Sequence, residues 1–145
     1  MSRLHLNQQE MQDLIKLSKE EGFPCELTEE VMTILAKNVA DDSFQLYGEY
    51  KDGQLASIGA ISIFLVFPCH DSPSGLIGHI SGVYTSPKFR HHGLSAAIVD
   101  QLIAAGREAG CDYVCLDSTA DELYRNAGFI HAPENETRMW HPLYE

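Results

Sequence analysis

Arg90-His91-His92-Gly93-Leu94-Ser95 is the most informative stretch of this chain. It follows a predicted strand over residues 78–85 and opens a predicted helix over residues 94–109. Free amides and the helix dipole make such a strand-to-helix turn an anion-binding site. Gly93 lets the backbone approach a ligand closely, and the small Ser95 does not obstruct that approach. The turn therefore predicts a site for the phosphate groups of a cofactor.

Basic side chains gather around this turn in an otherwise acidic protein. Lys88, Arg90, His91 and His92 form the densest basic cluster, whereas the whole chain carries a formal net charge of −11. Acidic residues are spread along the chain, which argues against a nucleic-acid partner. The acidity agrees with a cationic substrate, and it agrees equally with a charge that only keeps the protein in solution.

The 145 residues predict one domain, residues 1–145, with a core that needs neither a metal nor a disulfide for stability. No apolar run reaches the roughly 20 residues of a membrane span. The N-terminus lacks the pattern of a signal peptide, so we expect a cytoplasmic protein without a membrane partner. The four cysteines form no Cys-x-x-Cys pair and are expected to be reduced thiols.

The first half of the chain predicts two helices followed by strands. A short strand over residues 3–6 precedes a helix capped by Asn7 with Glu10 and a second helix capped by Thr28. Asp52-Gly53 is a strong hairpin signal between two strands. The predicted strands cover residues 44–51, 54–67 and 76–85. We expect the middle strand to be buried on both faces near its end.

The second half predicts one parallel connection. After the helix over residues 94–109 come a strand over 113–116, a short helix over 119–127 and a terminal hairpin of residues 129–132 and 137–141. The unit over residues 76–116 therefore places two strands parallel, with a right-handed crossover. The fold class is α/β in the sense of a mixed sheet (α+β) with helices on both sides.

This order and two motifs resemble the GNAT superfamily of acyl-CoA-dependent N-acetyltransferases. The family signature Q/R-x-x-G-x-G/A stands here as residues 90–95, with Ser95 where a Gly or Ala is usual and Pro87 shortly before it. A second family pattern, A-x-x-x-Y-x-x-x-G-F, stands at residues 120–129. The resemblance implies the GNAT fold, a central mixed sheet flanked by about four helices.

The resemblance also implies acetyl-CoA as co-substrate. The pyrophosphate is expected on the backbone amides of His91, His92, Gly93, Leu94, Ser95 and Ala96, with Arg90 orienting the loop. The pantetheine arm is expected along Val83, Tyr84 and Thr85, where the fourth strand leaves the fifth at a bulge. A bulge leaves backbone groups that must find partners. Asp117, at the end of the fifth strand, is expected to contact the cofactor or a substrate amine.

Two residues are candidates for proton transfer. Tyr124 occupies the place of the family's general acid, which gives a proton to the departing thiolate, or else packs as an ordinary helix aromatic. Many relatives carry a Glu on the fourth strand as base, but this strand has no carboxylate. His79, eleven residues before Arg90, is the candidate base instead. The alternative is an amine that arrives neutral and gives its proton to water.

The run Cys69-His70-Asp71 consists of residue types that bind metals. Three adjacent residues rarely converge on one ion, and no second Cys or His group stands at finger spacing, so we expect no metal. We interpret residues 68–75 as a loop that faces the substrate.

The expected function is transfer of an acetyl group to the primary amine of a small molecule or peptide, by direct attack in a ternary complex. A domain that binds CoA but is catalytically inactive, acting as a sensor or partner module, is the alternative that the missing strand carboxylate keeps open. A transferase for a longer acyl-CoA is a further one. A homodimer is compatible with the sequence, which carries no pattern that decides it.

Overall fold

The computed structural model describes residues 1–118, 121–130 and 141–142. In chain order these form β1 (Ser2–Leu4), α1 (Gln8–Ser18), α2 (Glu29–Val39), β2 (Phe44–Lys51), β3 (Gln54–Leu65), β4 (Leu76–Thr85), α3 (Leu94–Glu108), β5 (Tyr113–Cys115) and α4 (Asp121–Asn126). A single 3-10 turn, Pro87–Phe89, lies between β4 and α3.

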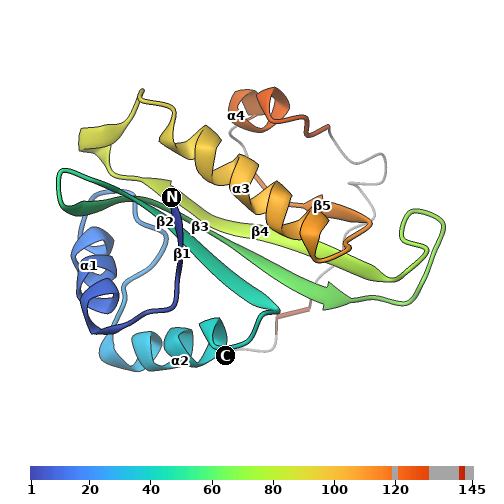
Figure 1. The fold of residues 1–145 in the computed structure, drawn as a ribbon, viewed down its shortest axis with the longest axis horizontal. Helices are drawn as coiled ribbons and strands as arrows, with labels where there is room; N and C mark the ends of the chain where they lie inside the picture. Colours follow the sequence, from blue (N-terminus) through green and yellow to red (C-terminus); the bar gives the residue numbers. More distant parts are fainter. Residues whose placement is uncertain (119–120, 131–140, 143–145) are drawn as a thin grey trace.

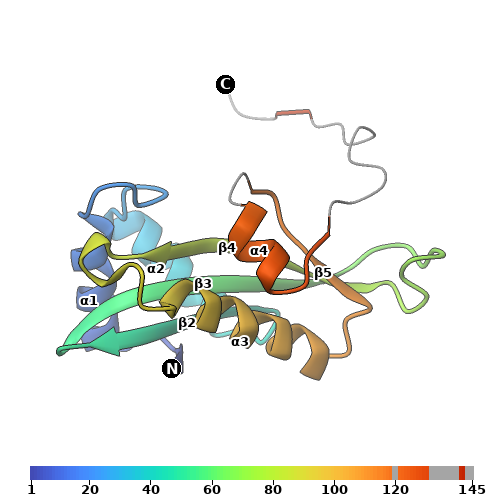
Figure 2. The ribbon, with the colours of Figure 1, turned by 90° about the horizontal axis from the view of Figure 1, so that it is seen from above.

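The strands form one mixed sheet in the order β1-β2-β3-β4-β5. β1 to β4 pair antiparallel, whereas β5 runs parallel to β4 after the crossover through α3. Helices α1 and α2 cover one face of the sheet, and α3 and α4 lie over the other (Figures 1 and 2). The predicted fold class, a mixed sheet with helices on both sides, is confirmed.

Each face of the sheet has its own hydrophobic core, because successive strand residues point to opposite faces. Ala60 of β3 belongs to the core under α1 and α2, whereas the adjacent Ile61 belongs to the core under α3. Glycines bring α3 close to the sheet. A Cβ on Gly59 would lie 2.5 Å from Ile98, and one on Gly106 would lie 2.6 Å from Val114. This packing fixes the place of α3 against β3 and β5.

The two helix caps and the hairpin turn predicted in the first half of the chain are confirmed. The amide of Glu10 donates to the Asn7 side chain at 2.8 Å, and the amide of Asn7 donates to the Glu10 carboxylate at 3.1 Å. The Thr28 hydroxyl accepts from the third residue of α2 at 3.2 Å. Asp52 and Gly53 both take left-handed backbone angles, as the tight hairpin between β2 and β3 requires.

Several boundaries differ from the sequence-based predictions. The first strand is Ser2–Leu4, because Leu6 has a left-handed φ of 59° that an extended strand does not accept. β3 ends at Leu65, and it is buried over residues 55–61 rather than near its end. Leu65 is 75% exposed, since the β3–β4 hairpin extends beyond the covering helices (Figure 2). The prediction for the end of this strand was wrong.

The C-terminal elements are only partly described. α4 covers Asp121–Asn126 within the predicted helix of residues 119–127. Phe129 and Ile130 have irregular backbone, and residues 131–140, which include most of the predicted terminal hairpin, lie outside the described residues. None of the helices in the described part of the chain combines the length and apolar character that a bilayer span requires.

Candidate active site

The predicted phosphate loop, residues 90–96, joins β4 to α3 through two left-handed residues. His91 has a φ of 68° and Gly93 a φ of 78°. Gly93 is the N-cap of α3, and no side chain caps that end of the helix. A Cβ on Gly93 would find open space. The first amides of α3 have no intrahelical acceptor, so the loop offers amides and the positive end of the helix dipole to an anion.

Two cations of the basic cluster contact protein groups. The Arg90 Nε atom donates to the carbonyl oxygen of Thr85 at 3.1 Å, so this side chain braces the loop against the end of β4. The Lys88 Nζ atom lies 3.2 Å from Gln54 Oε1 and 3.8 Å from Glu20 Oε1. The backbone amides are therefore the principal anion donors of the loop, and the nearby cations add favourable charge.

Buried hydroxyl groups connect the loop to the sheet. The Ser57 hydroxyl on β3 donates to the carbonyl oxygen of Tyr84 at 3.0 Å and lies 2.8 Å from the Thr85 hydroxyl. The Thr85 hydroxyl lies 2.6 Å from that of Ser95. Ser57 is fully buried and Thr85 is 7% exposed. Ser95, where the signature usually has Gly or Ala, thus ties the first turn of α3 to β4.

β4 carries a bulge directly before the loop. Ser81 pairs with Ala60 and Tyr84 with Ile58, so two residues of β4, Gly82 and Val83, stand opposite one residue of β3. Gly82 takes a φ of 65°, as such a bulge needs. β5 pairs with β4 only over residues 77–79, so β4 has no β5 partner beyond that point. Backbone groups without a ladder partner are available to a ligand.

The candidate base lies where β4 and β5 part. His79 is the last β4 residue that pairs with β5, opposite Cys115. Its Nε2 atom lies 3.8 Å from the Oδ2 atom of Asp117, which follows β5. The two side chains are 36% and 58% exposed, so both are accessible from solvent. The structure thus brings two of the predicted site residues together as an imidazole–carboxylate pair.

Tyr124, the candidate acid, lies on α4 and interacts with the segment that follows β5. Burial raises the pKa of the Tyr124 phenol, and a side-chain hydrogen bond with Ser118 acts in the opposite direction. The net shift is upward, so Tyr124 is protonated at neutral pH and can give a proton. Its ring stacks edge-on against Phe129 at 5.8 Å. Because Ser118 follows Asp117, Tyr124 and His79 both connect to the segment after β5.

Two features of this region were missing from the sequence-based predictions. The first is Ser57, whose signal was a hydroxyl inside an apolar strand, since a buried hydroxyl requires a partner. The second is the side chain of Tyr84, which is 6% exposed and packs against Phe23 in the segment between α1 and α2. The Tyr84 side chain therefore belongs to the core.

The predicted substrate-facing loop, residues 68–75, is held by a single carboxylate. Asp112 Oδ2 accepts from the Ser72 hydroxyl at 2.8 Å and from the Ser74 amide and hydroxyl at 3.0 and 2.7 Å. These hydrogen bonds lower the pKa of Asp112, and the bond from the Ser74 hydroxyl has the largest effect. No cluster of three or more His, Cys, Asp or Glu side chains that could hold a metal ion occurs within residues 1–118, 121–130 and 141–142.

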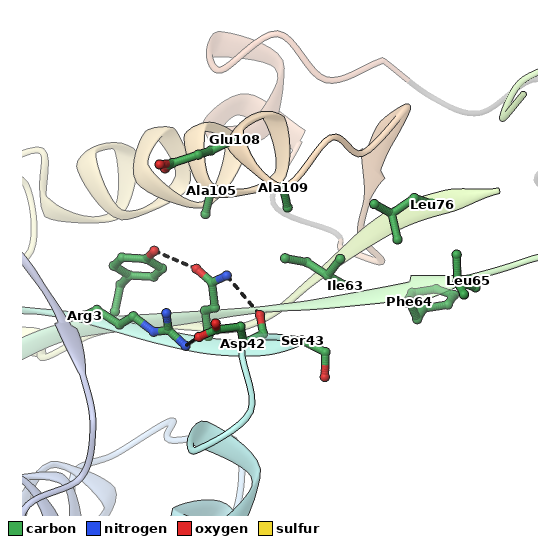
Figure 3. Close-up of a pocket in the computed structure, with 12 residues that line it drawn as sticks. Arg3, Asp42, Ser43, Ile63, Phe64, Leu65, Leu76, Ala105, Glu108 and Ala109 are labelled. Carbon is green, nitrogen blue, oxygen red and sulfur yellow. Dashed lines mark hydrogen bonds and ion pairs between the residues drawn. The ribbon is translucent and has the colours of Figure 1, made fainter. Parts of the chain in front are cut away.

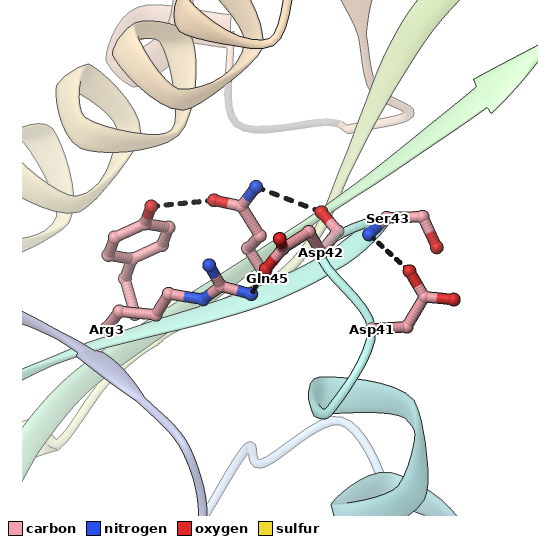
Figure 4. Close-up of polar contacts among 6 residues, drawn as sticks. Arg3, Asp41, Asp42, Ser43 and Gln45 are labelled. Carbon is pink, nitrogen blue, oxygen red and sulfur yellow. Dashed lines mark hydrogen bonds and ion pairs between the residues drawn. The ribbon is translucent and has the colours of Figure 1, made fainter.

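A groove of about 660 Å³ lies at the opposite, C-terminal end of α3 (Figure 3). It is lined by Arg3, Asp42, Ser43, Gln45, Tyr47, Ile63, Phe64, Leu65, Leu76, Ala105, Glu108 and Ala109. Several of the residues that line the groove make polar contacts with one another (Figure 4). Arg3 lies 2.9 Å from the Asp42 carboxylate, and the Tyr47 hydroxyl donates to Gln45 at 2.7 Å. No predicted site residue lines this groove.

Comparisons with known proteins agree with this geometry. Residues 9–129 match the model of the acetyltransferase (GNAT) family. A glucosamine 6-phosphate N-acetyltransferase of Trypanosoma brucei brucei is 32% identical over 84 residues, which are 57% of this chain and 56% of that protein. The matched part thus spans little more than half the length of this relative.

Solved structures share the fold at low identity. A predicted acetyltransferase of Clostridium acetobutylicum with acetyl-CoA superposes with a TM-score of 0.68 at 21% identity, over 92% of this chain and 83% of that one. Glucosamine-6-phosphate N-acetyltransferase of Arabidopsis thaliana gives 0.75 at 20%, over 99% and 98%. An aminoglycoside 6′-N-acetyltransferase of Acinetobacter haemolyticus gives 0.76 at 15%, over the full length of both chains.

The implied GNAT fold is therefore confirmed, by sequence and by structure. Because the family match extends over most of the chain, from before the middle of α1 to beyond α4, the protein belongs to the GNAT family of acetyltransferases.

Proposed function

We propose that this protein transfers the acetyl group of acetyl-CoA to the primary amine of a small molecule or peptide by direct attack. One observation carries the proposal. The uncapped N-terminus of α3 follows the carboxyl end of β4, β4 parts from β5 after His79, and an imidazole–carboxylate pair stands at the point of parting. Ligands of sheets with parallel strands generally bind at such strand ends.

The residues of this region fit the co-substrate. Open space at Gly93 and the free amides of residues 91–96 suit a pyrophosphate. The β4 backbone at Val83, Tyr84 and Thr85, next to the bulge, suits a pantetheine arm. The buried side chains of Tyr84 and Thr85 point away from solvent, so their contribution to binding comes from the backbone. Acetyl-CoA supplies an acetyl group activated as a thioester.

The chemistry follows from the two candidate proton-transfer residues. A neutral amine attacks the thioester carbon; a C–N bond forms and the C–S bond breaks. His79 takes the proton that the amine nitrogen loses, and the Asp117 carboxylate lies 3.8 Å from its Nε2 atom. Tyr124 gives its phenolic proton to the departing thiolate. Both substrates are held together, so orientation supplies much of the rate.

The acceptor class is drawn from the relatives. The Trypanosoma and Arabidopsis proteins are named for acetylation of glucosamine 6-phosphate, and another structural neighbour for acetylation of aminoglycosides. These names support a small-molecule amine as acceptor. Glucosamine 6-phosphate is accordingly the first acceptor to test, followed by an aminoglycoside and a lysine-containing peptide.

The decisive experiment is calorimetric titration with acetyl-CoA, CoA and ATP in parallel, followed by a thiol-release assay with the three amines. We expect micromolar binding of acetyl-CoA, much weaker binding of ATP, and thiol release that requires an amine. Failure to bind either CoA species would refute the proposal. CoA binding without turnover of any amine would instead favour the inactive module. With an active acceptor, His79→Gln tests the base, since it removes the rise in rate that accompanies deprotonation of an imidazole.

A further inference from the structure

The segment between α1 and α2, residues 19–28, packs against the end of β4. The phenol of Tyr84 donates a hydrogen bond of 2.7 Å to the carbonyl oxygen of Glu21. The Phe23 ring meets the Tyr84 ring edge-on, with centroids 5.0 Å apart. Tyr84 is 6% exposed, so this is a buried contact between residues that are 63 positions apart. We refer to residues 19–28 as the α1–α2 segment.

The Tyr84 ring also contacts the phosphate loop. The Arg90 guanidinium lies 5.8 Å from the Tyr84 ring centroid, and its Nε atom holds the Thr85 carbonyl. Gly22 lies beside both side chains, because a Cβ placed there would be 3.9 Å from Arg90 Nη2 and 3.9 Å from Tyr84 Cε1. A single aromatic ring therefore touches the α1–α2 segment and the first residue of the loop.

Charges on the two sides of this contact are complementary. The Lys88 Nζ atom of the loop lies 3.8 Å from Glu20 Oε1. Burial raises the pKa of Tyr84, the charge of Glu20 adds to the rise, and Arg90 opposes it. Both charged groups therefore interact electrostatically with the Tyr84 phenol. Glu20 Oε2 is buried and has no hydrogen-bond partner among the described residues. An unsatisfied buried oxygen costs free energy, which offsets part of the stabilisation that the contact provides.

We infer that Tyr84 is a positioning residue that joins the α1–α2 segment to the CoA site, so that CoA binding orders residues 20–23. The inference rests on the proposed CoA site. Tyr84 stands in the β4 stretch assigned to pantetheine and supports the residue that opens the phosphate loop. A ligand that immobilises both sides of the ring also immobilises what the ring holds. By reciprocity, the docked segment strengthens CoA binding.

The test is amide hydrogen exchange of peptides covering residues 20–25, with and without saturating CoA. Tyr84→Phe keeps the ring and its stacking but removes the hydroxyl. Tyr47→Phe is the matched control, because it removes a 2.7 Å phenol hydrogen bond in the groove at the other end of α3. We expect CoA to slow exchange in the wild type and in Tyr47→Phe. In Tyr84→Phe this protection is lost and the Kd for CoA rises roughly three- to tenfold, the scale of one hydrogen bond.

Unchanged exchange of residues 20–25 in wild-type protein that binds CoA would overturn the inference, as would full protection in Tyr84→Phe. Phe23→Leu, which removes the edge contact from the opposite side, repeats the test if Tyr84→Phe fails to fold. Amide hydrogen exchange of residues 20–25 measured without CoA distinguishes a failure of this inference from a failure of the proposed function. Faster exchange of residues 20–25 in the unliganded variant supports the docking contact even where calorimetry shows that the chain binds no CoA.

Discussion

The two ends of α3 differ in how they can serve a ligand. The N-terminal end has a left-handed Gly93, no side-chain cap and a tether to β4 through Ser95. The C-terminal end borders a groove of about 660 Å³, where Tyr47 is hydrogen-bonded to Gln45 and Arg3 to Asp42. The N-terminal end therefore offers backbone amides of the first helical turn, whereas the C-terminal end offers a lined groove.

The largest expected effect is on the proposed proton transfer. Tyr124→Phe removes the proposed proton donor and is expected to lower kcat by roughly 10²–10⁴-fold, the usual contribution of a general acid. Tyr47→Phe, at the groove, is expected to leave kcat unchanged. Because the folded protein raises the pKa of Tyr124, wild-type activity through this acid persists at mildly alkaline pH and falls only as the phenol ionises. Steady-state rates from pH 7 to 11 measure both effects. Equal kcat in the two variants would remove Tyr124 from the mechanism.

A pair of glycines tests the backbone difference between the two ends directly. Gly93 and Gly110 flank α3, both have left-handed φ values, of 78° and 87°, and a Cβ would find open space at either. Alanine at each costs about 1–2 kcal/mol of folding stability, because the strain is the same. Only Gly93→Ala strains the proposed phosphate loop, so we expect its Kd for CoA to rise about 5- to 30-fold.

Thermal melts and calorimetry of the two glycine variants provide the comparison. Matched losses of Tm with a selective loss of CoA binding support the assignment. Equal CoA affinity in Gly93→Ala and Gly110→Ala would mean that the loop amides do not hold the ligand.

The smallest expected effect is on stability near the C-terminal end of α3. Asp112 holds Ser72 and Ser74 of the hairpin loop, and its pKa is lowered in the folded protein. A lowered carboxyl pKa stabilises the fold above the ordinary value of about 3.9, and the contribution is lost as pH falls through the lowered value. Tm should thus depend less on pH between about 5 and 3 in Asp112→Asn than in the wild type. Asp100→Asn, at an exposed site on α3, is the control. Parallel pH curves for all three proteins would contradict this role.

Features of the fold that depend on neighbours in sequence were predictable. The turn at residues 90–95, the Asn7 cap and the Asp52-Gly53 hairpin follow from local backbone chemistry, and the structure places them as expected. The burial of β3 was not predictable in the same way. Which part of an apolar strand is covered depends on helices that are remote in sequence, and these cover residues 55–61 rather than Leu65.

The site shows the same division. His79 and Asp117 were separate candidates, and only the parallel pairing of β4 with β5 makes them neighbours. The contact of Tyr84 with Glu21 joins residues 63 positions apart and left no pattern in the sequence. The Gly22-Phe23-Pro24 run is typical only of a helix end, because periodicity describes an element and says nothing about which remote surface the following loop contacts.

The hydroxyl groups behind the loop have a fixed polarity, because each carries one hydrogen. Ser57 gives its hydrogen to the carbonyl oxygen of Tyr84, so Thr85 must give its own to Ser57, and Ser95 must give its own to Thr85. The Ser95 hydroxyl therefore presents only lone pairs at the loop and repels a phosphate oxygen that comes close, whereas the Ser95 backbone amide is still a donor. For the Ser95 hydroxyl to donate to such an oxygen, all three hydroxyls would have to reverse and the Tyr84 carbonyl would lose its donor. A serine deep in β3 thus determines which atoms of a surface loop can attract an anion.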